Sequence, residues 1–111
     1  MDFTVQELGK GIAVVRGAGR LNMVSAGQLR ELVAAAVEGG SARIVVDLAA
    51  VDFIDSSGLG ALVNGLKIAR QAGGDLRISA PTDQVKLVLQ LTNMERVLFS
   101  YPTVDSAYAN D

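Results

Sequence analysis

The stretch from Val51 to Leu66 constrains the fold of this chain more than any other part of its sequence. It begins as an apolar run, passes through Asp55-Ser-Ser-Gly58, and continues with apolar residues at helical spacing. A buried strand that leads directly into an amphipathic helix is typical of α/β proteins. Aspartate and serine are frequent N-cap residues, so a capping role is the simpler interpretation of Asp55 and Ser56.

Two strands and a helix are predicted before this stretch. Phe3–Gln6 alternates apolar and polar residues, and Ile12–Arg16 is rich in β-branched residues. The short glycine-containing gap between them favours an antiparallel hairpin, with Gly17–Gly19 ending the second strand. Ser25 and Gln28 have the spacing of a capping box, which predicts a helix from there to Gly39-Gly40.

Strands and helices continue to alternate on both sides of the junction. Ile44–Leu48 is a nearly continuous apolar run, which is typical of a strand buried on both faces. Leu76–Ile78 is a further internal strand, and Pro81–Asp83 opens another helix that a left-handed Asn93 ends.

The chain ends in weaker signals. Val97–Phe99 is predicted as a short edge strand, and Thr103–Tyr108 has weak helical character. The element order predicts one domain over residues 1–111 with an α/β fold. Its small mixed β-sheet combines an N-terminal antiparallel hairpin with the βα units that follow, and the helices pack against this sheet.

Composition excludes several functions. There is no cysteine and no histidine, which removes thiolate chemistry, the commonest metal ligand and the commonest general base. The net charge of −2 gives no electrostatic case for a nucleic-acid or anionic-lipid partner. No signal peptide is visible, and no apolar run approaches the roughly 20 residues that span a bilayer. We therefore expect a cytoplasmic protein without a membrane partner.

The helix after the junction has two apolar faces. One is the core stripe that includes Leu59, and the other is made of small side chains and one isoleucine: Ala61, Gly65 and Ile68, with Asn64 as its polar member. The second face is either a partner-binding surface or a face that packs under the N-terminal strands or a neighbouring helix. On the helical wheel Ser57 falls on this second face and Ser56 falls nearer the core stripe, which predicts that Ser57 is the more accessible serine.

No enzyme motif is present at the junction. A serine nucleophile needs a base, and Asp-Ser-Ser-Gly is not the Gly-x-Ser-x-Gly elbow of hydrolases. Gly58 and Gly60 lack P-loop spacing relative to Lys67. Asp47, Asp52 and Asp55 are too scattered to predict a metal site. We expect no enzymatic activity and no cofactor.

Two segments together resemble the signature of bacterial anti-sigma factor antagonists, the STAS domains. They are Ile44-Val-Val-Asp-Leu48 and Val51-Asp-Phe-Ile-Asp-Ser-Ser-Gly-Leu-Gly60. Gly74–Ile78 and Val85–Phe99 are similar to the family's C-terminal half. The resemblance implies a STAS fold and a partner-switching role in transcription regulation and stress response.

In such a switch the unphosphorylated antagonist binds an anti-sigma factor that is also a serine kinase, and so releases a sigma factor. The kinase, which binds ATP and magnesium, phosphorylates the second serine of the pair, and a serine phosphatase removes the phosphate. Carried over by position, the resemblance implies phosphorylation of Ser57, with Asp55, Ser56 and Gly58 supporting the site. Leu59 begins the adjoining helix and joins Ser57 in the predicted partner surface.

The resemblance departs from the family pattern at Asn22, where the family usually has aspartate close to the phosphoacceptor loop. An alternative function remains open: a constitutive STAS accessory subunit of a transporter or signalling complex that is not phosphorylated. Intact Asp-Ser-Ser-Gly favours the switch. Sensing of a small ligand at the same strand ends is a third possibility.

Overall fold

The computed structural model describes residues 1–110 and confirms the α/β fold. Its elements follow the predicted order: β1 (Asp2–Gly9), β2 (Ile12–Leu21), α1 (Met23–Glu38), β3 (Arg43–Ile54), α2 (Ser56–Gln71), β4 (Asp75–Ser79), α3 (Asp83–Leu91), a 3-10 turn (Met94–Arg96) and β5 (Ser100–Tyr101).

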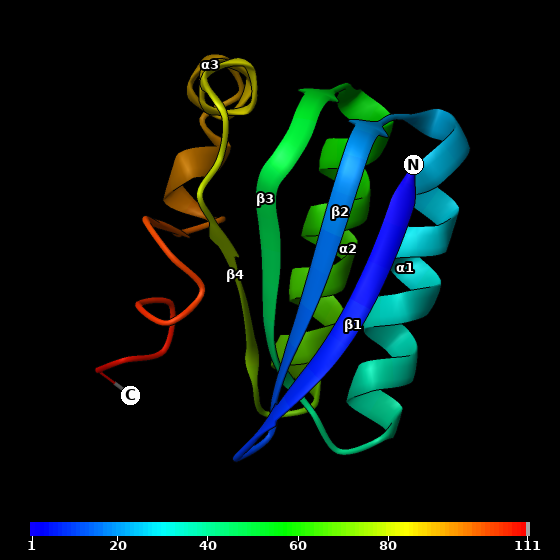
Figure 1. Cartoon of the computed structure of the whole chain (residues 1–111), viewed down its shortest axis with the longest axis vertical. Coiled ribbons are helices and arrows are strands. Elements are labelled where there is room, and N and C mark those ends of the chain that lie inside the picture. Colours follow the sequence, from blue (N-terminus) through cyan, green and yellow to red (C-terminus); the bar gives the residue numbers. More distant parts are fainter. Residues whose placement is uncertain (111) are drawn as a thin grey trace.

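The five strands form one mixed sheet in the order β1-β2-β3-β4-β5. β1 and β2 form the predicted antiparallel hairpin, in which Val5 lies opposite Val15. β2, β3, β4 and β5 run parallel, with Val15 beside Val46 and Val46 beside Ile78. The carboxyl ends of these parallel strands therefore meet at one end of the sheet, where α1, α2 and α3 begin (Figure 1).

The sheet is covered differently on its two faces. α1 and α2 lie side by side on one face, where buried Ile44, Val46 and Leu48 of β3 pack with helix residues such as Leu29 and Leu62. On the other face, Val45 packs with Val14, Ala107 and Tyr108 from the C-terminal segment. β3 is thus buried on both faces, as its unbroken apolar run predicts.

β2 continues through the glycines that were predicted to end it. It reaches Leu21, and its pairing with β3 shifts register between Arg16 and Ala18 and again between Gly19 and Arg20. Glycines inside a strand often mark such bulges because they accept unusual backbone angles. Gly19 has a φ of +114°, so the chain bends here without leaving the sheet.

The start of α1 also corrects the prediction. Its N-cap is Asn22, whose side chain accepts hydrogen bonds from the backbone N–H groups of Val24 and Ser25. Ser25 is the other half of this capping box, since its Oγ accepts from the Asn22 N–H at 3.0 Å. The Ser25–Gln28 pairing is therefore wrong, and α1 begins at Met23.

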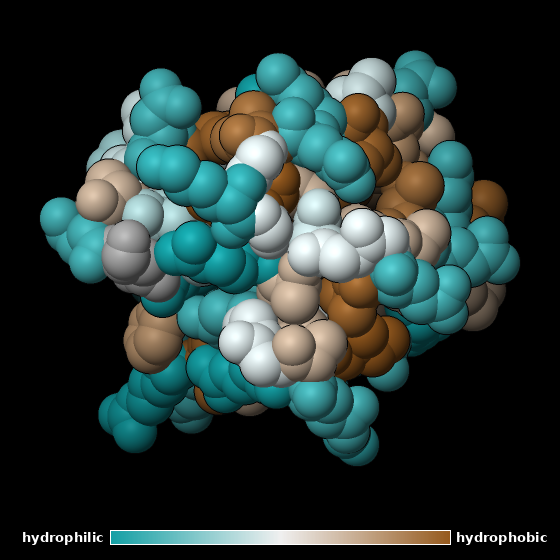
Figure 2. Space-filling model, turned by 90° about the horizontal axis from the view of Figure 1, so that it is seen from below, coloured by the Kyte–Doolittle hydropathy of each residue, from teal (hydrophilic) through white to brown (hydrophobic). Residues whose placement is uncertain are grey.

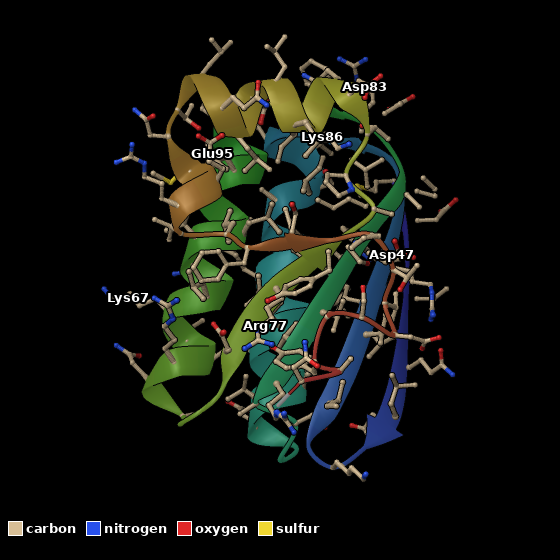
Figure 3. The ribbon with its side chains drawn as sticks, turned by 90° about the vertical axis from the view of Figure 1, so that its left-hand side faces the viewer. Asp47, Lys67, Arg77, Asp83, Lys86 and Glu95 are labelled. Carbon is tan, nitrogen blue, oxygen red and sulfur yellow. The ribbon has the colours of Figure 1, made fainter. Side chains whose placement is uncertain are left out.

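The C-terminal third keeps its predicted helix and strand with altered boundaries but lacks the predicted last helix. Asn93 has the predicted left-handed backbone, with a φ of +59° after α3. The last strand is Ser100–Tyr101 instead of Val97–Phe99, because buried Leu98 belongs to the turn that precedes it. Residues 103–108 form turns instead of a helix. Figure 3 shows this segment crossing the sheet near Arg77 and Asp47, below α3 with Asp83 and Lys86.

Candidate functional site

The junction between β3 and α2 is a capped helix start. Asp55 has an extended backbone, and its Oδ1 accepts a hydrogen bond of 2.9 Å from the Gly58 N–H. Asp55 is thus the N-cap of α2, and Ser56 and Ser57 are its first two residues. The capping interpretation holds for Asp55. Ser56 is not the cap, although it lies beside it.

The two serines differ in exposure, but in the order opposite to the prediction. Ser56 is exposed and Ser57 is half-buried. The helical wheel placed Ser57 correctly on the Asn64 side of α2, but α1 lies along that side and covers part of it. The hydroxyls of both serines make no hydrogen bond within residues 1–110. Both remain chemically available at the start of the helix.

Gly58 allows this junction to lie against the end of β2. A Cβ atom at Gly58 would collide with the carbonyl oxygen of Leu21 and would lie 2.8 Å from its Cγ. The same carbonyl accepts a hydrogen bond of 3.3 Å from the Asp55 N–H. No other residue type fits at Gly58 without a shift of the backbone. The supporting role predicted for Gly58 therefore has a structural basis in close packing.

Asn22 follows directly after Leu21, which brings it to the same end of the sheet as the serines. Its side chain is engaged as the α1 cap, with its Oδ1 3.0 Å from the Val24 N–H. An aspartate would cap equally well, since asparagine and aspartate are both strong N-cap residues. The difference between this chain and the pattern at Asn22 is therefore a missing negative charge beside the junction, with the cap itself retained.

The predicted partner face of α2 divides into two parts. Leu59, Ala61 and Gly65 are buried, so the prediction that they form a partner-binding surface is wrong. A Cβ at Gly65 would lie 2.9 Å from Leu76 on β4 and 3.3 Å from Val33 on α1, so this residue packs against both the sheet and α1. Asn64 is exposed and Ile68 is half-buried. The alternative of packing under a neighbouring helix holds for the small residues.

Exposed apolar side chains lie instead at the start of α1. Met23 is 76% exposed and Val24 is 88% exposed, and they precede the buried stripe of their helix. Leu87 and Leu91 on the outer side of α3 are also exposed. The start of α1 and the helix α3 both lie at the end of the sheet where α2 begins (Figure 1). The sequence carried a signal for Met23 and Val24, namely two large apolar residues outside the helical stripe.

α3 is tied to the strand that carries the junction. The Gln84 side chain accepts a hydrogen bond of 2.9 Å from the Ile54 N–H and donates one of 3.2 Å to the Ile54 carbonyl. The Thr82 hydroxyl donates to the Val51 carbonyl at 2.9 Å. Gln84 thus occupies the place of a neighbouring strand immediately before Asp55. The sequence gives no signal for this contact, since it joins residues 30 positions apart.

Other site types find little support. Among residues 1–110, no group of three or more acidic, histidine or cysteine side chains is placed to hold a metal ion. Two open pockets lie away from the serines: one beside Pro81 and Tyr101, the other beside Arg43 and Tyr108. Within the described part of the chain, no helix has the length and apolar character needed to cross a membrane.

Comparisons with known proteins identify the family to which this chain is similar. Residues 5–107 match the family model described as the STAS domain. A Thermotoga maritima protein with a provisional designation as an anti-sigma factor antagonist is 38% identical over 68 residues, covering 61% of this chain and 60% of that protein. This chain therefore matches less than two thirds of that relative's length.

Two further relatives match over more of their length. The anti-sigma-B factor antagonist of Bacillus subtilis is 32% identical over 82 residues, covering 73% of each chain. The crystal structure of an anti-sigma factor antagonist from Mycobacterium paratuberculosis superposes with a TM-score of 0.84 at 28% identity, covering 97% of this chain and 91% of that one. Similarity thus extends from the sequence to the whole fold.

Proposed function

The chain belongs to the STAS-domain family and to its group of anti-sigma factor antagonists, and on that premise we propose that it is a phosphorylation-controlled partner switch. Its unphosphorylated form binds an anti-sigma factor serine kinase in the cytoplasm and releases a sigma factor. This role is regulatory binding, so the chain needs no catalytic group of its own. One observation carries the proposal: Ser57 lies in the first turn of α2, at the end of the sheet where α1 begins with exposed Met23 and Val24.

The catalytic groups that phosphorylate Ser57 would belong to the partner kinase. Ser57 Oγ attacks the γ-phosphorus of ATP that the kinase holds with magnesium, and the bond to the bridging β,γ-oxygen breaks. ADP leaves, and the hydroxyl proton passes to a base of the kinase. A serine phosphatase reverses the change by hydrolysis of the phosphate ester. In this scheme the antagonist contributes only the hydroxyl and a fixed geometry around it.

The added phosphate would weaken binding through charge. It brings a charge of about −1.5 to −2 close to Asp55 and next to the exposed apolar side chains. In an interface this charge costs desolvation energy and repels acidic groups of the partner. The helix dipole at the start of α2 tolerates a negative charge, so the fold itself is not threatened. Asn64 and half-buried Ile68 remain in the proposed contact surface, together with Met23 and Val24.

Incubation with the cognate kinase and ATP, followed by mass spectrometry of the peptides, tests the site. We expect phosphate on Ser57. Phosphate on Ser56 would overturn the site assignment, and an unmodified chain that still binds its partner would favour the constitutive accessory subunit. This test is demanding because Ser56 is the more exposed serine, so accessibility alone would favour phosphorylation of Ser56.

Ser57→Asp tests the mechanism of the switch. We expect affinity for the kinase to fall at least about tenfold, roughly 1.4 kcal/mol, while the melting temperature stays nearly unchanged. Ser57→Ala is the control, since it removes the phosphoacceptor without adding charge and should bind like the unmodified chain. Equal affinity of Ser57→Asp and the unmodified chain, measured by calorimetry, would contradict the electrostatic mechanism.

A further inference from the structure

Arg30 of α1 reaches across to the first turns of α2. It is an exposed residue, and its Nη2 lies 3.8 Å from the position that a Cβ atom on Gly60 would occupy. Gly60 is itself half-buried. The guanidinium therefore rests over the bare backbone of α2 at Gly60, and a side chain larger than a methyl group there would displace it.

Gly60 lies one helical turn after the two serines. Residues three and four positions apart on a helix are neighbours, with Cβ atoms about 5–6 Å apart. On the wheel of α2, at about 100° per residue, Ser57 and Asn64 lie between Gly60 and the side that packs on α1. An arginine that extends from α1 to Gly60 therefore reaches it from the side of α2 that carries Ser57 and Asn64. Ser56 lies on the far side of Gly60.

The charge of Arg30 is not neutralised by a neighbour. Some other arginines do have a counter-ion: Arg16 pairs with Asp47, and Arg70 pairs with Asp75. Arg30 makes no ion pair within the described residues 1–110. A guanidinium without a counter-ion thus lies at Gly60, one helical turn after a half-buried serine whose hydroxyl has no hydrogen-bond partner within the described residues.

We infer that Arg30 binds the phosphate of phosphorylated Ser57 within the same chain. The inference rests on the proposed phosphorylation of Ser57 and assigns the residue that receives the phosphate. The planar guanidinium donates two parallel hydrogen bonds to phosphate oxygens, which a lysine cannot reproduce. Because Gly60 has no side chain, the space between the guanidinium and the phosphate stays open. The phosphate is then held in the seam between α1 and α2 instead of projecting freely into solvent.

This pairing separates the roles of the two serines. Ser56 is the more exposed hydroxyl, but a phosphate there would lie across Gly60 from the α1 side. Ser57 is half-buried on a helix that packs against α1, and α1 also supplies the cation. Partial burial of Ser57 is therefore part of the phosphate site and does not argue against modification.

The experiment installs phosphoserine directly at position 57 by genetic-code expansion, so that no kinase is needed. The second pKa of the phosphate, ordinarily about 6, is then followed by phosphorus NMR in the full chain. We expect Arg30→Gln to raise this pKa by about half a unit or more, because a nearby cation favours the dianion. Arg30→Lys should restore part of the shift. Lys67→Gln on exposed α2 is the matched control and should leave the pKa nearly unchanged.

The outcomes separate this inference from the proposed function. Equal pKa values for the Arg30→Gln and unmodified chains would overturn the inference, as would an equal effect of Lys67→Gln. A larger effect of Arg30→Gln on phosphoserine placed at position 56 would also overturn it. Failure of the kinase to modify Ser57 would contradict the proposed function alone, since the installed phosphate still reports on Arg30.

Discussion

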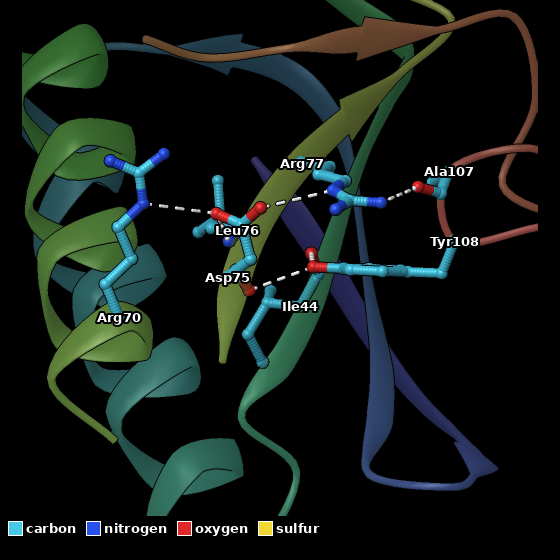
Figure 4. A network of polar contacts seen from close by, with 7 residues as sticks. All are labelled: Ile44, Arg70, Asp75, Leu76, Arg77, Ala107 and Tyr108. Carbon is cyan, nitrogen blue, oxygen red and sulfur yellow. Dashed lines mark hydrogen bonds and ion pairs between the residues drawn. The ribbon is translucent and has the colours of Figure 1, made fainter. Parts of the chain in front are cut away.

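The two ends of the sheet use their polar side chains in different ways. At the amino ends of β3 and β4, Asp75 accepts hydrogen bonds from Arg70, Arg77 and the Leu76 N–H (Figure 4). At the carboxyl ends, Ser56 and Ser57 have hydroxyls without a hydrogen bond inside the described chain. At the carboxyl end Asn22, Asp55 and Gln84 are also hydrogen-bonded, but the hydroxyls of the two serines stay available. We call this the open end of the sheet and the opposite one the closed end.

Tyr108 completes the closed end. Its hydroxyl lies 2.9 Å from the carbonyl oxygens of both Ile44 and Asp75, and its ring lies under the guanidinium of Arg77 at 4.3 Å. This network fixes the C-terminal segment over the second face of the sheet. Seen from this end, the surface is largely hydrophilic, with separate hydrophobic areas between the polar side chains (Figure 2).

We therefore expect substitutions at the closed end, around Asp75 and Tyr108, to alter stability without affecting partner binding. Surface substitutions at the open end, around Ser56 and Ser57, should alter partner binding with little effect on stability. Gly58 is the exception, because it lies at the open end and packs directly against buried Leu21 of β2. We expect Gly58→Ala to have the largest effect, lowering the free energy of unfolding by about 3 kcal/mol through the clash with Leu21. Urea denaturation measures it.

Gly27→Ala is the matched control for Gly58→Ala. Gly27 lies inside α1, and a Cβ atom there meets nothing within 4 Å. Alanine should therefore stabilise the protein by roughly 0.5–1 kcal/mol through helix propensity. If Gly58→Ala were as harmless as Gly27→Ala, the close packing of the junction on β2 would not hold in solution.

The next effect belongs to the closed end. Tyr108→Phe removes the shared hydrogen bond to two carbonyl groups and should cost about 1–2 kcal/mol of stability. Affinity for the anti-sigma factor should stay the same, because Tyr108 lies at the opposite end from Ser57. Tyr101→Phe is the control, because the Tyr101 hydroxyl makes no hydrogen bond within residues 1–110. Loss of affinity in Tyr108→Phe would break the separation of the two ends.

A third change tests the open end by itself. Val24→Ser should reduce affinity for the anti-sigma factor about tenfold, roughly 1.4 kcal/mol, because it removes an exposed apolar contact. Stability should change by less than about 0.5 kcal/mol, as expected for a surface residue. Leu8→Ser, near the hairpin turn, is the control that should leave affinity unchanged. Equal losses in the two variants would place the partner elsewhere.

Local sequence patterns predicted the fold well because each element carries its own period and boundary signals. The unbroken run Ile44–Leu48 predicted a doubly buried strand, and Asp55 predicted the start of α2. Residues 103–108 were mispredicted because contacts with Val14 and Val45, far away in sequence, decide their conformation. Local propensity holds no information about such contacts.

The site was harder to predict for a related reason. The wheel of α2 correctly gave two apolar faces, but it does not say which element covers each. Right-handed crossovers between the adjacent parallel strands β2, β3 and β4 place α1 and α2 on the same face of the sheet. Ala61 and Gly65 are then needed for close packing on α1. Strand order, which the sequence does not give directly, was the missing step.

Asn22 gives the smallest effect and the finest test of the open end. Asn22→Asp keeps the cap and adds a negative charge at the start of α1, which should stabilise the protein by about 0.3–1 kcal/mol through the helix dipole. The gain should shrink at high salt because the charge is screened.

Asn22→Ala removes the cap and should cost about 1 kcal/mol at any salt concentration. Urea denaturation at two salt concentrations separates these contributions, and a salt-independent gain in Asn22→Asp would contradict the charge argument. The added carboxylate lies at the same end of the sheet as the serines, so it should also raise the pKa of a phosphate on Ser57, because a nearby like charge disfavours the dianion.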